Sequence, residues 1–129
     1  MELQVYHNTT IKEVKEKFSR FFPFLKVEFF LYHRQTEDTP SGREIYKGRY
    51  LEETSEFFKE GTICFSPGTS IAQLEQEFQI ELGIYAKIYR KSVENWVDTT
   101  QTSHLSLAKQ NNMGGAVMQP RLNIHTLFL

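Results

Sequence analysis

The sequence predicts an α+β domain built from two tandem strand–helix–strand (βαβ) units. Residues 3–22 and 63–82 follow one pattern, in which three residues recur at matched positions: Thr9, Ile11 and Phe18 in the first copy, and Thr69, Ile71 and Phe78 in the second. In both copies an alternating segment precedes a capped amphipathic helix, and a second alternating segment follows it. Two successive units of this kind favour a split-βαβ, ferredoxin-like sandwich, an open sheet with two helices on one face. A β-grasp arrangement is the alternative.

The first unit begins with a short strand in which Leu3 and Val5 alternate with polar residues. Thr10 and Glu13 then have the spacing of a capping box, which predicts a helix start. The apolar residues that follow lie on one stripe of a 3.6-residue helix: Ile11, Val14, Phe18 and Phe22. Pro23 ends this helix, and the next strand has alternating apolar residues: Leu25, Val27, Phe29 and Leu31.

The second unit repeats this order. A strand contains Ile63 and Phe65, and Ser70 with Gln73 forms the second capping box. The apolar stripe of the second helix is Ile71, Leu74, Phe78 and Leu82. Gly83 is expected to end the helix, and a strand follows that contains Ile84, Ala86 and Ile88.

We expect one domain over residues 1–115, with units at 1–32 and 61–100 and a polar insertion at 33–60 between them. Within the insertion, residues 51–59 are expected to form a short helix. An extra strand is predicted at 96–99, and a short helix at 104–112 that Gly114 and Gly115 would end. Residues 116–129 are expected to be a C-terminal tail, either a docking strand or an exposed end.

Length and composition favour a self-sufficient fold in a reducing compartment. The 129 residues include eleven Phe, enough for a sizeable core. A net charge of −1 provides no global field that would concentrate nucleic acid or anionic lipid. One cysteine excludes an intramolecular disulfide, and no apolar run has the length of a signal peptide or membrane span. We therefore expect a soluble cytoplasmic protein that does not enter a membrane.

No motif indicates catalysis, a metal or a cofactor. Cys64 lies between Ile63 and Phe65 in a predicted strand and is expected to be a small buried hydrophobe. The four histidines stand apart, without the spacing of metal ligands. The turn at 66–69 lacks the second glycine and the lysine of a phosphate-binding loop. The expectation is a non-enzymatic protein without a cofactor.

The outer face of the predicted sheet is the candidate interaction surface. If the apolar positions of each strand face the helices, the intervening aromatic and basic residues face outward, and the candidate residues are Phe30, Tyr32, Tyr85, Lys87, Tyr89 and Arg90. Such a face suits a protein partner or a second copy of the chain. Interleaved aromatic and basic residues also suit single-stranded nucleic acid, which is the alternative partner.

The two predicted helices carry opposite charge. Four basic residues outnumber two acidic ones at 12–20, whereas residues 72–82 contain three glutamates and no basic residue. In a ferredoxin-like fold the helices lie side by side, so we expect Lys15 or Lys17 to pair with Glu75 or Glu77.

Several segments together resemble a family of small uncharacterised bacterial proteins, chiefly from Bacteroidetes. The resemblance rests on the patterns at 9–30 and 61–79, and extends to 89–92, 96–100 and 107–111. It covers about the first 115 residues, and the sequence departs from the family pattern from Ala116 onward. The resemblance implies a bacterial cytosolic origin. No established activity comes with it, so it carries over no catalytic residues.

Overall fold

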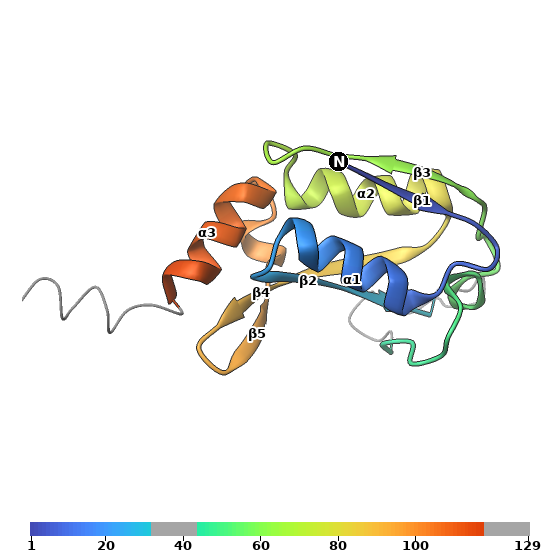
Figure 1. Cartoon of the computed structure of the whole chain (residues 1–129), viewed down its shortest axis with the longest axis horizontal. Helices are drawn as coiled ribbons and strands as arrows, with labels where there is room; N and C mark the ends of the chain where they lie inside the picture. The colour runs from blue at the N-terminus through green and yellow to red at the C-terminus, as the bar shows by residue number, and fades with distance from the viewer. Residues whose placement is uncertain (32–43, 118–129) are drawn as a thin grey trace, which may run out of the picture.

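A computed structural model describes residues 1–31 and 44–117 of the chain. The strands are β1 (Glu2–Val5), β2 (Leu25–Phe30), β3 (Gly61–Cys64), β4 (Tyr85–Ser92) and β5 (Asn95–Asp98). The α-helices are α1 (Ile11–Phe21), α2 (Ile71–Leu82) and α3 (Leu107–Val117), and the short 3-10 helices are η2 (Leu51–Thr54) and η3 (Thr100–Thr102) (Figure 1). The α+β class and the strand–helix–strand order of both predicted units are confirmed.

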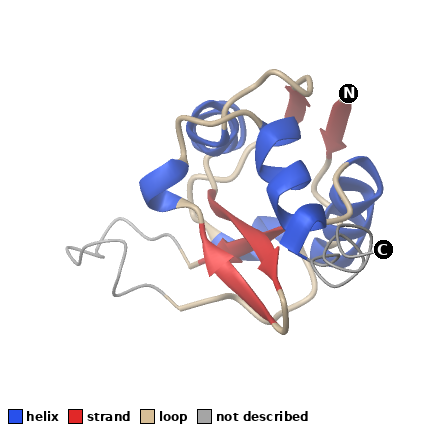
Figure 2. Cartoon of the chain, turned by 90° about the vertical axis from the view of Figure 1, so that its left-hand side faces the viewer, coloured by secondary structure: helices blue, strands red, loops and turns tan. Residues whose placement is uncertain are grey.

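The strands form two separate antiparallel sheets, so the ferredoxin-like arrangement is not confirmed. One sheet has the order β1-β3 and the other has the order β2-β4-β5 (Figures 1 and 2). A ferredoxin-like sandwich would place all four strands in one sheet with β2 and β4 at opposite edges, whereas here β2 and β4 pair directly and β1 and β3 form a sheet of their own. The two strands of each βαβ unit belong to different sheets, and each pairs with its counterpart from the other unit.

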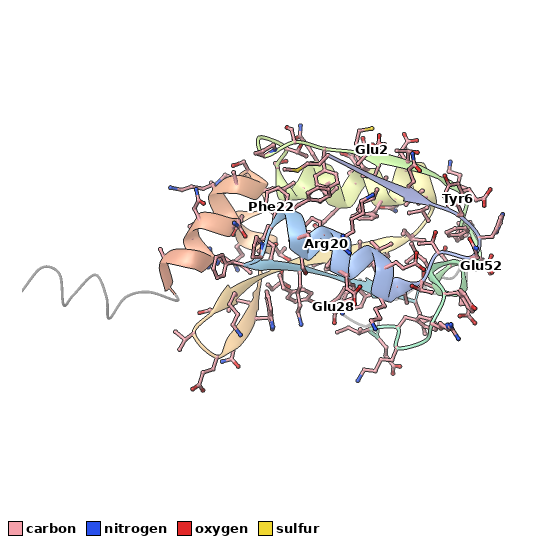
Figure 3. The ribbon with its side chains drawn as sticks, in the orientation of Figure 1. Glu2, Tyr6, Arg20, Phe22, Glu28 and Glu52 are labelled. Atoms are coloured by element: carbon pink, nitrogen blue, oxygen red, sulfur yellow. The ribbon has the colours of Figure 1, made fainter. Side chains whose placement is uncertain are left out.

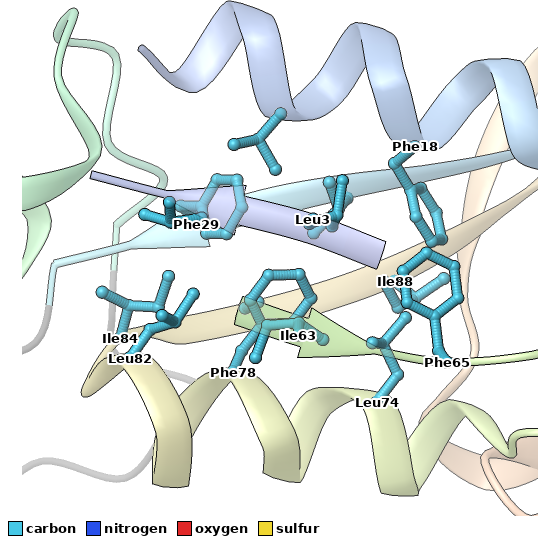
Figure 4. Packing of buried hydrophobic residues seen from close by; sticks show 14 of the residues in the cluster. Leu3, Phe18, Phe29, Ile63, Phe65, Leu74, Phe78, Leu82, Ile84 and Ile88 are labelled. Atoms are coloured by element: carbon cyan, nitrogen blue, oxygen red, sulfur yellow. The ribbon is translucent and has the colours of Figure 1, made fainter. Parts of the chain in front are cut away.

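The core lies between the two sheets and the two long helices. Figure 4 shows α1 and α2 on opposite sides of the buried cluster, with Phe18 reaching in from one and Phe78 from the other. Both side chains are fully buried. Strands of both sheets close the remaining sides, with Leu3 and Ile63 from β1 and β3, and Phe29 and Ile88 from β2 and β4. The apolar stripes of both helices are therefore buried in one common core.

The register of the strand pairs indicates a pseudo-two-fold relation between the units. Leu3 and Ile63 occupy matched positions of the sequence repeat and are paired with each other. When the apolar positions of β2 and β4 are aligned, Glu28 matches Lys87, and these two residues are also paired. Matched residues of antiparallel strands face each other only at a local two-fold axis. Such an axis therefore passes through both sheets and between the helices.

The same relation extends into the segment predicted to be an insertion. Phe30 of β2 is bridged to Ile45, as Tyr89 of β4 is paired with Asp98. Each helix N-cap also has a matched bridge, Thr10 to Tyr50 and Ser70 to Ser106. In each unit the next residue is a fully buried leucine that begins a further helix, Leu51 for η2 and Leu107 for α3. Residues 44–54 thus have a structural counterpart in the second unit.

The helix ends follow the predicted signals except in α3. Both capping boxes form, and Gly83 caps α2 with a left-handed φ of 66°. Gly114 and Gly115 were expected to end the last helix, but α3 continues to Val117. A Cβ at Gly114 would lie 2.8 Å from Phe24 Cβ, so the missing side chain allows α3 to approach the chain before β2 closely.

Because α1 and α2 lie on opposite sides of the core, the expected pairing between the helices is wrong. Lys15 of α1 instead forms an ion pair with Glu28 of β2. Glu75 of α2 accepts a hydrogen bond from Ile88 N–H of β4, at 2.8 Å. Each helix is therefore tied to the following strand of its own unit.

Candidate interaction face

The outward side chains of the β2-β4-β5 sheet form a surface that we call the aromatic–lysine face. Its members are Lys26, Phe30, Tyr85, Lys87, Tyr89, Lys91 and Trp96. The alternation that buries Val27, Phe29 and Ile88 places these side chains on the opposite side of the sheet. In Figure 2 this sheet lies at the front of the molecule.

Four of the six predicted surface residues belong to this face. Phe30 and Tyr85 are paired across β2 and β4, and their rings make an edge contact with centroids 5.8 Å apart. Lys87 and Tyr89 follow on β4 at every second residue. Phe30 is only 8 % exposed, so it packs against Tyr85 and offers little surface of its own to a partner. Tyr32 lies outside the described residues.

Arg90, the sixth, does not belong to the face. Arg90 follows Tyr89 directly on β4, and adjacent residues of a strand point to opposite sides of the sheet. Its guanidinium Nη1 donates to Gln110 Oε1 of α3 at 3.2 Å and lies 3.6 Å from Met113 Sδ. Arg90 therefore helps to attach α3 to the sheet.

Three members of the face are not among the six predicted residues: Lys26, Lys91 and Trp96, whose ring is the most exposed of the face. The Lys26 and Lys91 ammonium groups lie 5.0 Å and 5.2 Å from the centroid of the Trp96 ring. Lys26 also lies 5.7 Å from the Tyr89 ring centroid. The available signal was the β4–β5 hairpin, because its turn sets the register that pairs Lys91 with Trp96.

Two carboxylates beside the face, Glu28 and Asp98, are paired within the molecule. Glu28 binds Lys15, and its other carboxylate oxygen lies 4.0 Å from Lys26 Nζ; Figure 3 shows Glu28 beneath α1. Lys87 Nζ lies 3.6 Å from Asp98 Oδ1 on β5. Lys91, by contrast, has no carboxylate within ion-pair distance among the described residues. The charge available to a ligand is therefore concentrated near Trp96.

Two ionisable groups of this region are shifted. Burial, reinforced by the negative charge of Asp98, raises the pKa of the Tyr89 phenol above its ordinary value. For Asp98, burial acts to raise the pKa, but hydrogen bonds from the Thr100 hydroxyl and N–H, together with Lys87, outweigh it and lower the pKa. Tyr89 thus remains neutral and Asp98 charged at neutral pH, which keeps the Lys87–Asp98 pair intact.

Cys64 lies in the other sheet and is exposed rather than buried. The two-residue alternation of β3 turns Ile63 into the core, so its neighbour faces solvent opposite Glu2. No group of three His, Cys, Asp or Glu side chains in the described residues is arranged to hold a metal ion. Within the same residues, no helix is long and apolar enough to cross a membrane.

Comparison of the chain with protein-family models, with curated proteins and with solved structures finds no match.

Proposed function

We propose that the chain is a non-enzymatic interaction module whose aromatic–lysine face binds an acidic segment of a partner protein. The observation that supports it most is Trp96, the single tryptophan, which is 36 % exposed and flanked by the Lys26 and Lys91 ammonium groups. Tryptophan ranks among the residues that contribute most to protein–protein affinity. Two adjacent cations add attraction for carboxylates and speed their association.

A protein partner fits this face better than single-stranded nucleic acid. Stacking of bases requires free aromatic faces on adjacent strands. Here lysine ammonium groups already lie over the Trp96 and Tyr89 rings, and the Phe30 and Tyr85 rings contact each other. Tyr6, an exposed tyrosine that could also stack on a base, follows β1 in the separate β1-β3 sheet and so lies away from this face.

The test selects peptides on the full chain from a random display library. The enriched sequences should be rich in Asp and Glu, and a synthetic peptide should change the fluorescence of Trp96 in a saturable way. A Lys26→Ala/Lys91→Ala variant should bind that peptide at least about tenfold more weakly, since an interfacial charge pair contributes on the order of 1.5 kcal/mol or more. Lys59→Ala/Lys109→Ala, which removes two exposed lysines elsewhere on the molecule, is the matched control and should bind normally.

Different results identify the alternatives. Oligo-dT or oligo-U that quenches Trp96 with steep salt dependence, in the absence of any selected peptide, would indicate nucleic-acid binding instead. Sedimentation that shows a dimer sensitive to Lys26→Ala/Lys91→Ala would indicate a second copy as the partner. Acidic peptides that bind equally well to the wild-type protein and to Lys26→Ala/Lys91→Ala would exclude this face as their binding site.

A further inference from the structure

A cleft of about 810 Å³ lies between the first half of α1 and the segment that precedes η2. Its walls are residues 10–13, 15, 16, 28 and 45–49. Cavities that bind small molecules are typically of this size, roughly 300–1,000 Å³. No residue of the aromatic–lysine face lines the cleft, so the cleft is a separate candidate binding site.

Cations predominate among the groups of the cleft that are free to bind. The basic side chains are Lys12, Lys15, Lys47 and Arg49. All three carboxylates of the lining have partners: Glu13 is held in the capping box, Glu16 lies 3.8 Å from Lys12, and Glu28 binds Lys15. Lys47 and Arg49 have no ion pair with any described residue, and the Arg49 guanidinium lies over the Tyr50 ring.

One wall of the cleft is flat and partly apolar. A Cβ built at Gly48 would lie 2.1–2.4 Å from atoms of the Tyr46 ring, so the tyrosine packs directly on this glycine. Ile45 beside it is 39 % exposed. A tyrosine held against the backbone in this way offers an aromatic surface to a planar ligand group.

The second unit has no such arrangement, although its helix begins in the same way. Ile11 N–H donates to Arg49 O in the first unit, and Ile71 N–H donates to Leu105 O in the second. In each unit the matched segment thus contacts the start of that unit's own helix. In the second unit Ala72 N–H also donates to Ser103 O at 2.9 Å, which closes the segment over the helix start. Ala72 and Glu75 replace Lys12 and Lys15 there. The open, basic cleft is therefore a divergence specific to the first unit.

We propose that this cleft binds a small organic phosphate that carries a planar ring. Lys47 and Arg49 supply the positive charge that a phosphate needs, and Arg in particular can donate two parallel hydrogen bonds to it. The ring packs against Tyr46 and Ile45. The cleft is far larger than one phosphate ion, which is why the ligand has an organic part.

The test titrates full-length protein with AMP, GMP, UMP and flavin mononucleotide, and with adenosine and inorganic phosphate as partial ligands. Chemical shifts of backbone amides report where each compound binds. At least one of the four phosphates should bind saturably and shift amides at 10–16 and 45–49, more tightly than adenosine or phosphate alone. Lys47→Gln/Arg49→Gln should weaken it at least tenfold. Lys59→Gln/Lys109→Gln removes the same charge elsewhere and should leave binding unchanged.

The Gly48→Ala variant tests the contribution of the planar ring to binding separately from that of the phosphate group. The added methyl group displaces Tyr46 without altering any charge, so it should weaken the organic phosphate while leaving the affinity for inorganic phosphate unchanged. Saturable binding that is insensitive to Lys47→Gln/Arg49→Gln would overturn the proposal. So would the absence of saturable binding by all four compounds to the folded wild-type protein. Neither result bears on the aromatic–lysine face, which is tested with peptides.

Discussion

At the scale of single residues, Lys15 and Glu75 show how matched positions acquired different roles. Both lie on the first half of their helix and reach the following strand of their own unit. Lys15 meets a carboxylate, Glu28, whereas Glu75 meets only a backbone N–H. Burial raises the pKa of Glu75, although the hydrogen bond from Ile88 N–H and the charge of Lys87 partly offset it.

The raised pKa of Glu75 predicts a pH dependence of stability. A carboxyl group whose pKa is higher in the folded state than the ordinary 4.5 stabilises the fold fully below its unfolded pKa. This contribution is lost as pH rises through the folded pKa. Glu75→Gln keeps an oxygen that accepts from Ile88 N–H but cannot ionise. In urea denaturation its stability relative to wild type should therefore rise between pH 4 and pH 7.

The control for that experiment is Glu81→Gln, on the exposed side of the same helix. It makes the same charge change without removing a buried carboxylate. A stability difference between Glu75→Gln and wild type that stays constant with pH, or one that Glu81→Gln reproduces, would contradict the prediction.

The common core predicts that Phe18 and Phe78 contribute alike to stability. Both are fully buried, and each packs in an aromatic contact, Phe18 with Phe22 and Phe78 with Phe29. Replacement of either by alanine should lower the free energy of unfolding by about 3–5 kcal/mol, as measured by chemical denaturation. A nearly silent substitution at one of the two sites would show that the units do not share the core equally.

At the scale of elements, the close approach of α3 to Phe24 predicts an unusual response to alanine. In a helix interior Gly→Ala normally stabilises by about 1 kcal/mol. At Gly114 the new Cβ would meet Phe24 Cβ at 2.8 Å and the Phe24 carbonyl oxygen at 3.2 Å. Gly114→Ala should therefore destabilise by about 1–3 kcal/mol. Asn112→Ala, at an exposed position of α3, should not, and thermal unfolding of both variants compares them.

The elements were predictable from sequence because their signals are local. The capping boxes and apolar stripes of α1 and α2 lie within a dozen residues, and the structure has both helices where these signals place them. The end of α3 was not predictable, because two glycines normally end a helix unless a distant contact such as Phe24 uses the space they leave.

Strand pairing and the cleft were not predictable either, because both depend on contacts between residues that are distant in sequence. Alternation shows which side of a strand is buried, so it placed Phe30, Tyr85, Lys87 and Tyr89 on one face. It does not show which strand lies next to which, since a ferredoxin-like sandwich would bury the same residues. The cleft depends on residues 45–49 meeting α1, which no short pattern encodes.

At the scale of the whole molecule, the two units form one domain because neither unit can pair its own strands. β1 needs β3 and β2 needs β4, so each sheet exists only when both units are present. The pseudo-two-fold axis through the Leu3–Ile63 and Glu28–Lys87 pairs explains why the sequence repeat and the fold agree. The proposed sites break this symmetry: the cleft belongs to the first unit and Trp96 to the second.

The antiparallel pairing of β1 with β3 is the central claim, and the native Cys64 allows a direct test. Glu2 is the partner of Cys64 in this register, and both side chains are exposed. Phe65 N–H donates to Met1 O, so Met1 and Phe65 form a hydrogen-bonded pair of the ladder. The neighbouring Glu2–Cys64 pair is therefore a non-hydrogen-bonded pair, in which the two Cα atoms are about 4.5 Å apart. This separation suits a disulfide. In a parallel pairing of the two repeats, Gln4 would lie beside Cys64 instead.

Mild oxidation of Glu2→Cys and Gln4→Cys, followed by peptide mass spectrometry, measures which position reaches Cys64. Antiparallel pairing predicts that Glu2→Cys forms an intramolecular disulfide with Cys64 rapidly and completely, while Gln4→Cys, opposite Thr62, retains two free thiols. A disulfide in Gln4→Cys and free thiols in Glu2→Cys would contradict the antiparallel register of β1 and β3.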